Sequence, residues 1–403
     1  MVRPLDGIRV LEWTVFQQGP VAGMMLADMG AEVIKIEDRV TGDPGRGMMS
    51  ILGATTDIAG RNTYFEINNR GKRSVTLDLR KPQGREILYD LIKVSDVFLH
   101  NHRRNYASKL SLDYDTLSKI NPMLIYATAS SWGPKGPEAL EPAMDYSGQA
   151  KAGLFYLIEE GLPPSYLYGC APADQMGGII TAYGILGALL AKERLGVGQQ
   201  LDASMLSGLV WLQSLAIAFT LLNGKEPRHT PRSEAGNPLW NHYRCGDDRW
   251  IALANSQADK AWPGLCKALG LEYLQNDPRF VDIAARGKNA RELVQLLDGV
   301  FLTKTCDEWI NILRQEAVII ARVNTLADLV SDEQVLANKF IEEFEHPVWG
   351  PIKVPANPVI YERTPLAITR EAPEFGQHTE EVLIEILGMD WNQICQLKDG
   401  EII

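Results

Sequence analysis

Short apolar segments alternate with helical ones over the first 130 residues of this chain, and this alternation limits the fold more than any other feature. Strands are predicted at GIRVLEW, EVIKIE, RSVTLDL, DVFLHN and MLIYATAS. Helices are predicted between them, at GPVAGMMLADMGA and at the amphipathic KPQGREILYDLIKVS. Strands separated by helices are typical of a parallel sheet with helices on its faces. We therefore predict an α/β fold.

Basic and amide side chains follow the predicted strands. Ligands of open α/β sheets bind beyond the carboxyl ends of the strands, and such side chains hold phosphates by charge-assisted hydrogen bonds. Each of them alone is typical of a solvated surface, but together they predict a site for a nucleotide-like ligand. The residues are Gln17, Gln18, Arg39, Arg80, Asn101, His102, Arg103, Arg104 and Lys109.

A single carboxylate, Asp174, precedes a run from Gln175 to Ala191 that contains no charged residue. We expect Asp174 in the first turn of a long helix, where the helix dipole favours a negative charge. Two interpretations are open: Asp174 only caps the helix, or it is an ionised nucleophile. For a nucleophile, amides near residues 175–177 would stabilise an oxyanion. Gly177 and Gly178 would let a ligand approach the backbone.

The second half of the chain has a different composition. GKEPRHTPRSEAGNP predicts a linker, and WNHYRCGDDRWIALA predicts a hairpin with its turn at Gly246-Asp247-Asp248. Another hairpin is predicted at Gly350-Pro351, and a final helix is predicted in APEFGQHTEEVLIEILGMD. Ala203 to Gly224 is free of charge, and we interpret it as buried helix, in a core or a subunit interface, rather than as a membrane span.

Composition and missing motifs exclude several functions. The net charge of −11 leaves no basic stripe for nucleic acid. The five cysteines form no CxxC pair, which argues against disulfides or a zinc ribbon and favours a cytoplasmic protein. The sequence lacks GxGxxG, GxxxxGK[ST], HExxH and GxSxG. His100 and His102 lack a third ligand, so no metal site is predicted.

Four segments resemble family III CoA-transferases, the formyl-CoA/carnitine CoA-transferase family, in their order and spacing. They are PLDGIRVLEWTVFQQGPVAGMMLADMGAEVIKIE with GDPGR, YFEINNRGKRSVTLDLRKPQGREIL, GQQLDASM and FGQHTEEVL. The resemblance extends over nearly the whole chain. It implies CoA and acyl-CoA as substrates, a carboxylic acid as acceptor, and no tightly bound cofactor.

The resemblance also implies roles for single residues. Asp174 matches the catalytic aspartate, and Gln17 matches a position that contacts CoA and orients the acyl intermediate. Residues 77–80, including Leu77 and Arg80, match the loop at the adenosine end of CoA. The positions that match phosphate contacts are Asn101, His102 and Lys109, and Asp145 matches an acidic position lining the active site.

The implied architecture is a Rossmann-like large domain built from both chain ends, with a smaller domain between them. We predict residues 1–226 as the first part of the large domain, 227–325 as the small domain, and 326–403 as the return. Family members form interlocked, ring-like homodimers. The chain departs from the family at Asp38, where relatives often carry a basic residue and Arg39 follows, and at residues 231–242, where the glycine-rich flap of formyl-CoA enzymes is missing.

The implied reaction is CoA transfer through a thioester on Asp174. Two alternatives are an α-methylacyl-CoA racemase and a CoA-binding protein without turnover. The related racemases place a histidine before the aspartate of the motif seen here as AMDYSG, and this chain has Met144 there, which cannot shuttle a proton. Residues 238–244 are expected to select the acid. Leu239, Trp240, His242 and Tyr243 favour an aryl or branched acid.

Overall fold

The computed structural model describes residues 2–51, 53–158, 167, 169–227 and 230–403. Residues 228 and 229 of the predicted linker lie outside the described residues. The chain divides into two compact units, Met1–Pro227 with Lys339–Ile403, and Arg228–Asn338. The sequence placed the divisions at 226 and 325, so the second unit is longer at its C-terminal end than expected.

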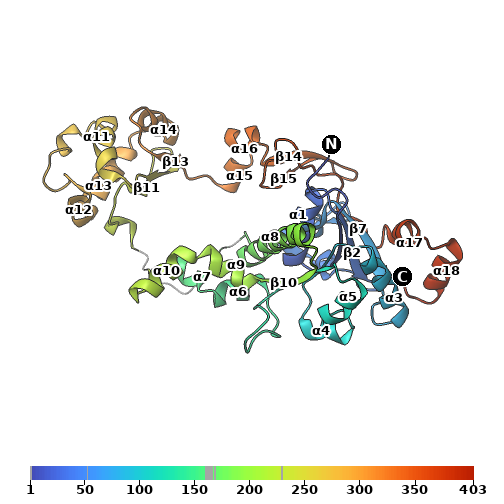
Figure 1. The fold of residues 1–403 in the computed structure, drawn as a ribbon. Helices are drawn as coiled ribbons and strands as arrows, with labels where there is room; N and C mark the ends of the chain where they lie inside the picture. Colours follow the sequence, from blue (N-terminus) through green and yellow to red (C-terminus); the bar gives the residue numbers. More distant parts are fainter. Residues whose placement is uncertain (1, 52, 159–166, 168, 228–229) are drawn as a thin grey trace. The chain divides into compact units, whose positions relative to one another are not determined.

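A six-stranded parallel sheet forms the centre of the first unit (Figure 1). The chain first adds strands on one side of β1 and then returns to add three on the other side, which gives the order β10-β9-β8-β1-β2-β7. The switch point between β1 and β8 is where open α/β sheets bind ligands. The strands are β1 (Arg9–Trp13), β2 (Glu32–Asp38), β7 (Lys72–Leu77), β8 (Val97–His100), β9 (Ile125–Ser130) and β10 (Gln199–Ser204).

Helices cover both faces of this sheet. One face packs against α1 (Gln18–Asp28) and α8 (Pro172–Leu195), and its core includes Val10, Val33 and Val97. The opposite face packs against α3 (Pro82–Lys93), α5 (Tyr114–Ile120), α17 (Thr379–Leu387) and α18 (Trp391–Asp399). The five predicted strands are present. Edge strand β10 was not predicted, because the polar residues Gln199, Gln200 and Asp202 interrupt its apolar pattern. Helix α18 was not predicted either.

The two glycines after Asp174 serve helix packing. A Cβ on Gly177 would lie 2.7 Å from Gln18 Nε2, and one on Gly178 would lie 2.7 Å from Val21 Cγ1. Both neighbours belong to α1, so the glycines let α1 and α8 come close together. The side of each glycine on which a Cβ would stand is filled by α1, and the expected approach of a ligand to this backbone stays a prediction.

The second unit is an antiparallel sheet covered by helices. Its strands are β11 (Trp240–Arg244), β12 (Trp250–Ala254) and β13 (Ile320–Arg322), in that order across the sheet. The predicted hairpin is confirmed, because β11 and β12 pair antiparallel. The main helices are α11 (Ala258–Leu269), α12 (Ile283–Lys288), α13 (Ala290–Phe301) and α14 (Cys306–Gln315).

Shorter elements complete the chain. They are η1 (Pro44–Gly47), β3 (Ser50–Ile51), β4 (Ala54–Thr55), β5 (Asp57–Ile58), β6 (Arg61–Asn62), α2 (Thr63–Asn69), α4 (Arg104–Lys109), α6 (Asp145–Lys151), α7 (Leu154–Ile158), η2 (Arg232–Glu234), η3 (Glu272–Leu274), α15 (Leu326–Leu329), α16 (Glu333–Ala337), β14 (Ile341–His346) and β15 (Gly350–Pro355). The last two strands form the predicted second hairpin.

The apolar segment after β10 forms two helices, α9 (Met205–Leu212) and α10 (Ser214–Asn223). Within the single chain α10 has no buried residue, and Leu215 and Leu222 are each 86% exposed. The expected burial is therefore not provided by this chain alone. In the described part of the chain, α8 and the α9–α10 pair, bent by 71°, are long and apolar enough to cross a membrane, which core helices of soluble proteins also are.

Candidate active site

Asp174 lies in the first turn of α8, but it does not cap the helix. The N-cap residue, Ala171, adopts a left-handed φ of 40° and offers no side-chain cap. Asp145, at the start of α6, caps α8 instead: its Oδ1 accepts from Ala173 N at 2.7 Å and from Asp174 N at 3.2 Å. Gln175 N donates to Ala171 O at 2.9 Å, so the expected oxyanion donor at position 175 is already occupied.

The Asp174 carboxylate has no hydrogen-bond or ion-pair partner among the described residues. Burial, with a further contribution from the charge of Asp145, raises its pKa from the ordinary 3.8 to about 7. A carboxylate that water solvates poorly and no cation neutralises keeps its lone pairs available to attack a carbonyl carbon. The site therefore holds an unpaired carboxylate whose ionised fraction rises through neutral pH.

Tyr64 is a polar residue near Asp174 that sequence reasoning missed. It lies in the first turn of α2, and its ring faces Gly45, whose ideal Cβ would be 3.3 Å from Tyr64 Cε1. Burial raises the pKa of Tyr64 above its ordinary value, and the charges of Asp174, Asp43 and Asp145 raise it further. The phenol therefore stays a neutral O–H donor. Nothing in the sequence distinguishes Tyr64 from a packing residue, because its place depends on the loop before α2.

The loop between β1 and α1 carries Gln17, which is the N-cap residue of α1 and makes no side-chain cap. Two of the predicted ligand residues hold this region together. Asn101 accepts from Val15 N at 2.9 Å and donates to Val15 O at 2.7 Å. Gln18 donates to the carbonyls of Ser130 at 3.1 Å and Ala203 at 3.4 Å. Both amides are engaged with protein, and their predicted contact with CoA stays a prediction.

A pocket of about 190 Å³ opens at the carboxyl ends of β1, β2 and β7. Three predicted residues, Leu77, Arg80 and His102, line it, together with Trp13 and Tyr106, which the sequence did not single out. The His102 and Trp13 rings are 4.0 Å apart between centroids. Burial lowers the pKa of His102 to about 4, so this imidazole is neutral at pH 7.

The predicted basic residues pair with protein groups or face solvent. Arg39 donates to Ile403 O at 3.1 Å and pairs with Glu401 at 3.5 Å. Lys109 is exposed in the last turn of α4. Arg80, within the pocket, pairs with Asp78 at 2.8 Å and with Asp38 at 3.5 Å. Across the described residues, no group of three or more His, Cys, Asp or Glu side chains is placed to hold a metal ion.

The segment expected to select the acid alternates between two faces of β11. Leu239 and Tyr243 are fully buried in the core of the second unit, and Tyr243 Oη donates to Pro238 O at 2.7 Å. Their expected contact with the acid is therefore replaced by a packing role. Trp240, His242 and Arg244 are exposed on the opposite face.

The chain matches the model of CoA-transferase family III over residues 5–379. It is 30% identical to (R)-2-hydroxy-4-methylpentanoate CoA-transferase of Clostridioides difficile, over 99% of both chains. It is also 30% identical to succinyl-CoA:glutarate CoA-transferase of Mus musculus, over 98% of this chain and 89% of that protein. Among solved structures, a CAIB/BAIF family protein from Brucella suis matches with a TM-score of 0.84 and 28% identity, over 96% of this chain and 100% of that one.

Proposed function

Because this chain belongs to CoA-transferase family III, we propose that it moves CoA from an acyl-CoA donor to a free carboxylic acid through a thioester on Asp174. The observation that carries this proposal is the unpaired Asp174 carboxylate at the start of α8. Asp145 takes over the capping of the helix, which leaves the Asp174 side chain free for covalent chemistry.

The proposed reaction balances without a proton donor or an energy source. Ionised Asp174 attacks the thioester carbonyl of the donor, expelling CoA thiolate and leaving a mixed anhydride. The thiolate attacks the Asp174 carbonyl, which releases the donor acid and forms the aspartyl thioester. The acceptor carboxylate then attacks this thioester, the thiolate leaves, and it attacks the acceptor carbonyl of the new anhydride. The products are the new acyl-CoA and free Asp174.

Each tetrahedral intermediate carries an oxyanion, and the start of α8 has no free amide at positions 173 to 175 to bind it. We propose that Tyr64 supplies a neutral donor in this region, since its raised pKa keeps the phenol protonated. Gln17, at the N-terminus of the neighbouring helix α1, is the second proposed contact with the acyl group. The reaction also requires that water be kept from the anhydride, because water would hydrolyse it.

We propose that the pocket lined by Leu77, Arg80 and His102 binds the nucleotide end of CoA. Trp13 and Tyr106 add aromatic surface, their centroids being 5.7 Å apart, and a purine ring packs well on such a surface. Arg80 is the cation at the rim of the pocket and is exposed to solvent, so it can reorient from Asp78 toward a phosphate.

The acid is proposed to be aryl or branched. Exposed Trp240 and His242 on β11 support this choice, because both offer flat aromatic rings to the side chain of an acid. The relative from Clostridioides difficile is named for a branched hydroxy acid, whereas the one from Mus musculus is named for dicarboxylates. Exposed Arg244, which pairs with Asp248 at 2.8 Å, is the residue that would meet a second carboxylate.

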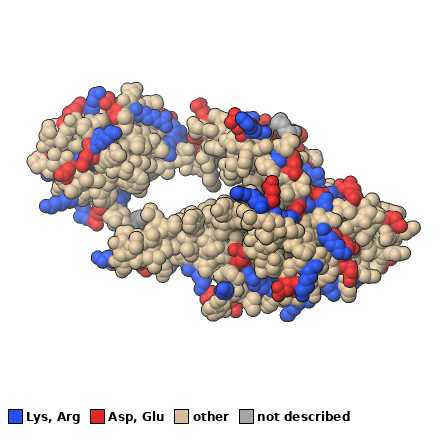
Figure 2. Space-filling model, viewed as in Figure 1, with Lys and Arg blue, Asp and Glu red and all other residues tan. Residues whose placement is uncertain are grey.

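We propose that the protein is a cytoplasmic homodimer. The support is the uncovered apolar surface of α9 and α10, where Trp211, Leu215, Leu221 and Leu222 are all more than 70% exposed. In the space-filling view the surface over α10 is largely free of charged side chains (Figure 2), and exposed apolar surfaces of this kind mark protein interfaces. A Leu215→Glu/Leu222→Glu variant should sediment as a monomer, whereas a Lys225→Glu control should remain a dimer. A double variant that remains a dimer would show that α10 is not part of the interface.

The test of the nucleophile is a chemical trap. Wild-type protein is incubated with acyl-CoAs and a panel of acids, treated with hydroxylamine, digested and analysed by mass spectrometry. We expect a hydroxamate on Asp174 and new CoA esters of some acids, and neither product from Asp174→Asn. Modification of another residue, or ester formation by Asp174→Asn, would overturn the mechanism.

A second arm addresses the racemase alternative. The protein is incubated with an α-methylacyl-CoA in deuterated water without acceptor acid. A transferase leaves the α-hydrogen in place, because no base of this reaction touches it. Uptake of deuterium at the α-carbon would favour proton exchange, and tight CoA binding without either product would favour the binding protein.

A further inference from the structure

The loop from Thr14 to Gln17 holds an uncommon backbone conformation directly before Gln17. Phe16 has a φ of 62°, which residues other than Gly, Asn and Asp rarely adopt. This left-handed conformation costs an alanine-like residue on the order of 1 kcal/mol. The conformation therefore persists only where surrounding groups hold it.

Three side chains hold three consecutive residues of this loop. Lys35 Nζ donates to Thr14 O at 2.9 Å, and Asn101 makes the two hydrogen bonds to Val15. Asp43 Oδ1 accepts from Phe16 N at 3.0 Å. The three side chains come from β2, from the segment after β8 and from the segment after β2, so parts of the sequence far apart converge on one loop.

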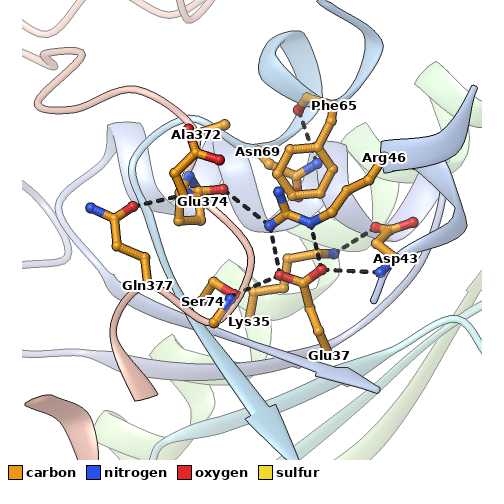
Figure 3. A network of polar contacts seen from close by, with 12 residues as sticks. Lys35, Glu37, Asp43, Arg46, Phe65, Asn69, Ser74, Ala372, Glu374 and Gln377 are labelled. Atoms are coloured by element: carbon orange, nitrogen blue, oxygen red, sulfur yellow. Dashed lines mark hydrogen bonds and ion pairs between the residues drawn. The ribbon is translucent and has the colours of Figure 1, made fainter. Parts of the chain in front are cut away.

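Asp43 is the only one of these that is bound to both the strained residue and a buried cation. Its Oδ2 lies 2.9 Å from Lys35 Nζ, and its Oδ1 also accepts from Gly45 N at 2.8 Å. Its backbone N–H donates to Glu37, which pairs in turn with Arg46 at 2.7 Å (Figure 3). The Arg46 guanidinium stacks 3.6 Å from the centroid of Phe65.

The cations of this network are themselves anchored. Lys35 lies 3.2 Å from Glu12, and Glu12 lies 2.8 Å from Lys72, all three side chains being fully buried. Burial alone would raise the pKa of Asp43, but the charge of Lys35 and the N–H of Phe16 hold it below its ordinary value. Ionised Asp43 is thus part of a buried network of ion pairs that cannot rearrange without unpairing a buried charge.

We propose that Asp43, oriented by Lys35, is a positioning residue for CoA transfer: it fixes the Phe16 peptide and thereby holds Gln17 in place at the N-terminus of α1. This inference rests on the proposed function. The next residue, Gln18, packs against Gly177, one turn beyond Asp174, which places this end of α1 at the nucleophile's helix. Asp43 also lines the pocket proposed for CoA, so it connects the nucleotide end of the site with the acyl end.

The test compares Asp43→Asn with a matched control, Asp113→Asn, in the full-length protein. Asp113 likewise accepts a backbone N–H, that of Thr116 at 3.0 Å, but lies at the start of α5, remote from the loop. For Asp43→Asn we expect kcat at least tenfold lower and faster amide hydrogen exchange in residues 14–19. The pH at which kcat is half-maximal should not move, because Asp145 and burial set the pKa of Asp174.

A rescue variant separates positioning from general folding. Glycine adopts a positive φ without cost, so Phe16→Gly added to Asp43→Asn should recover part of kcat and of the hydrogen-exchange protection, and it remains testable if Asp43→Asn alone folds poorly. Unchanged kcat in folded Asp43→Asn, or no recovery in the double variant, would overturn the positioning role. A wild-type protein that forms no hydroxamate on Asp174 would instead overturn the proposed function, whatever Asp43 variants do.

Discussion

Asp174→Asn should abolish transfer and at the same time stabilise the fold at neutral and alkaline pH. Burial and the charge of Asp145 raise the pKa of Asp174 from 3.8 to about 7. A carboxyl whose pKa is raised by folding contributes stability below its unfolded pKa, and this contribution is lost as the pH rises through the folded pKa. Asparagine mimics the protonated form in shape and carries no charge at any pH.

The magnitude follows from the two pKa values. Each pKa unit corresponds to about 1.4 kcal/mol, so the ionised carboxylate costs up to about 4 kcal/mol above pH 8. At pH 4 most of this cost is absent, because Asp174 is protonated in the folded state, and the variant should gain less than about 1 kcal/mol there. The gain should rise steadily between these limits.

The assay is urea unfolding of wild type and Asp174→Asn at a series of pH values, at fixed protein concentration. Asp115→Asn is the control, since Asp115 is exposed in the first turn of α5 and should show a small effect of constant size. A gain for Asp174→Asn that does not depend on pH, or a loss of stability at pH 8, would refute the view that Asp174 is held in a costly, poorly solvated state.

Two further predictions concern the same region. Asp145→Asn removes the like charge beside Asp174, so the pH at which kcat/KM is half-maximal should move below about 7, measured as a pH–rate profile; an unmoved or raised midpoint would contradict the electrostatic argument. Gly23→Ala would place a Cβ on Glu12 Oε2 within the buried ion cluster and should lower the free energy of unfolding by about 1–3 kcal/mol. The control is Gly187→Ala in α8, where the added Cβ meets nothing; this change should raise the free energy of unfolding by about 0.5–1 kcal/mol. Equal effects of the two changes would refute the close approach of α1 to the cluster.

The sequence was sufficient for the parallel sheet and for the family. The five predicted strands are apolar and short, and helices separate them, so their period and spacing carry the information locally. The place of Asp174 in the first turn of a long helix also followed from local pattern, because a lone carboxylate before a long chargeless run stands out, whereas its catalytic role stays a prediction. Strand β10 and helix α18 were missed because each is only partly apolar, and packing against neighbours decides such elements.

What the sequence by itself determined was which residue types follow which strand, since that order is written in the chain. Only the tertiary structure decided which of these side chains line a pocket and which are hydrogen-bonded to other parts of the protein. Asn101 and Gln18 have the chemistry of ligand contacts, yet both are hydrogen-bonded to backbone groups. Tyr64 lies near Asp174 and Trp13 lines the pocket, although the sequence singled out neither residue. The cause is physical: a polar side chain takes the nearest unpaired group, and folding alone decides which group lies nearest.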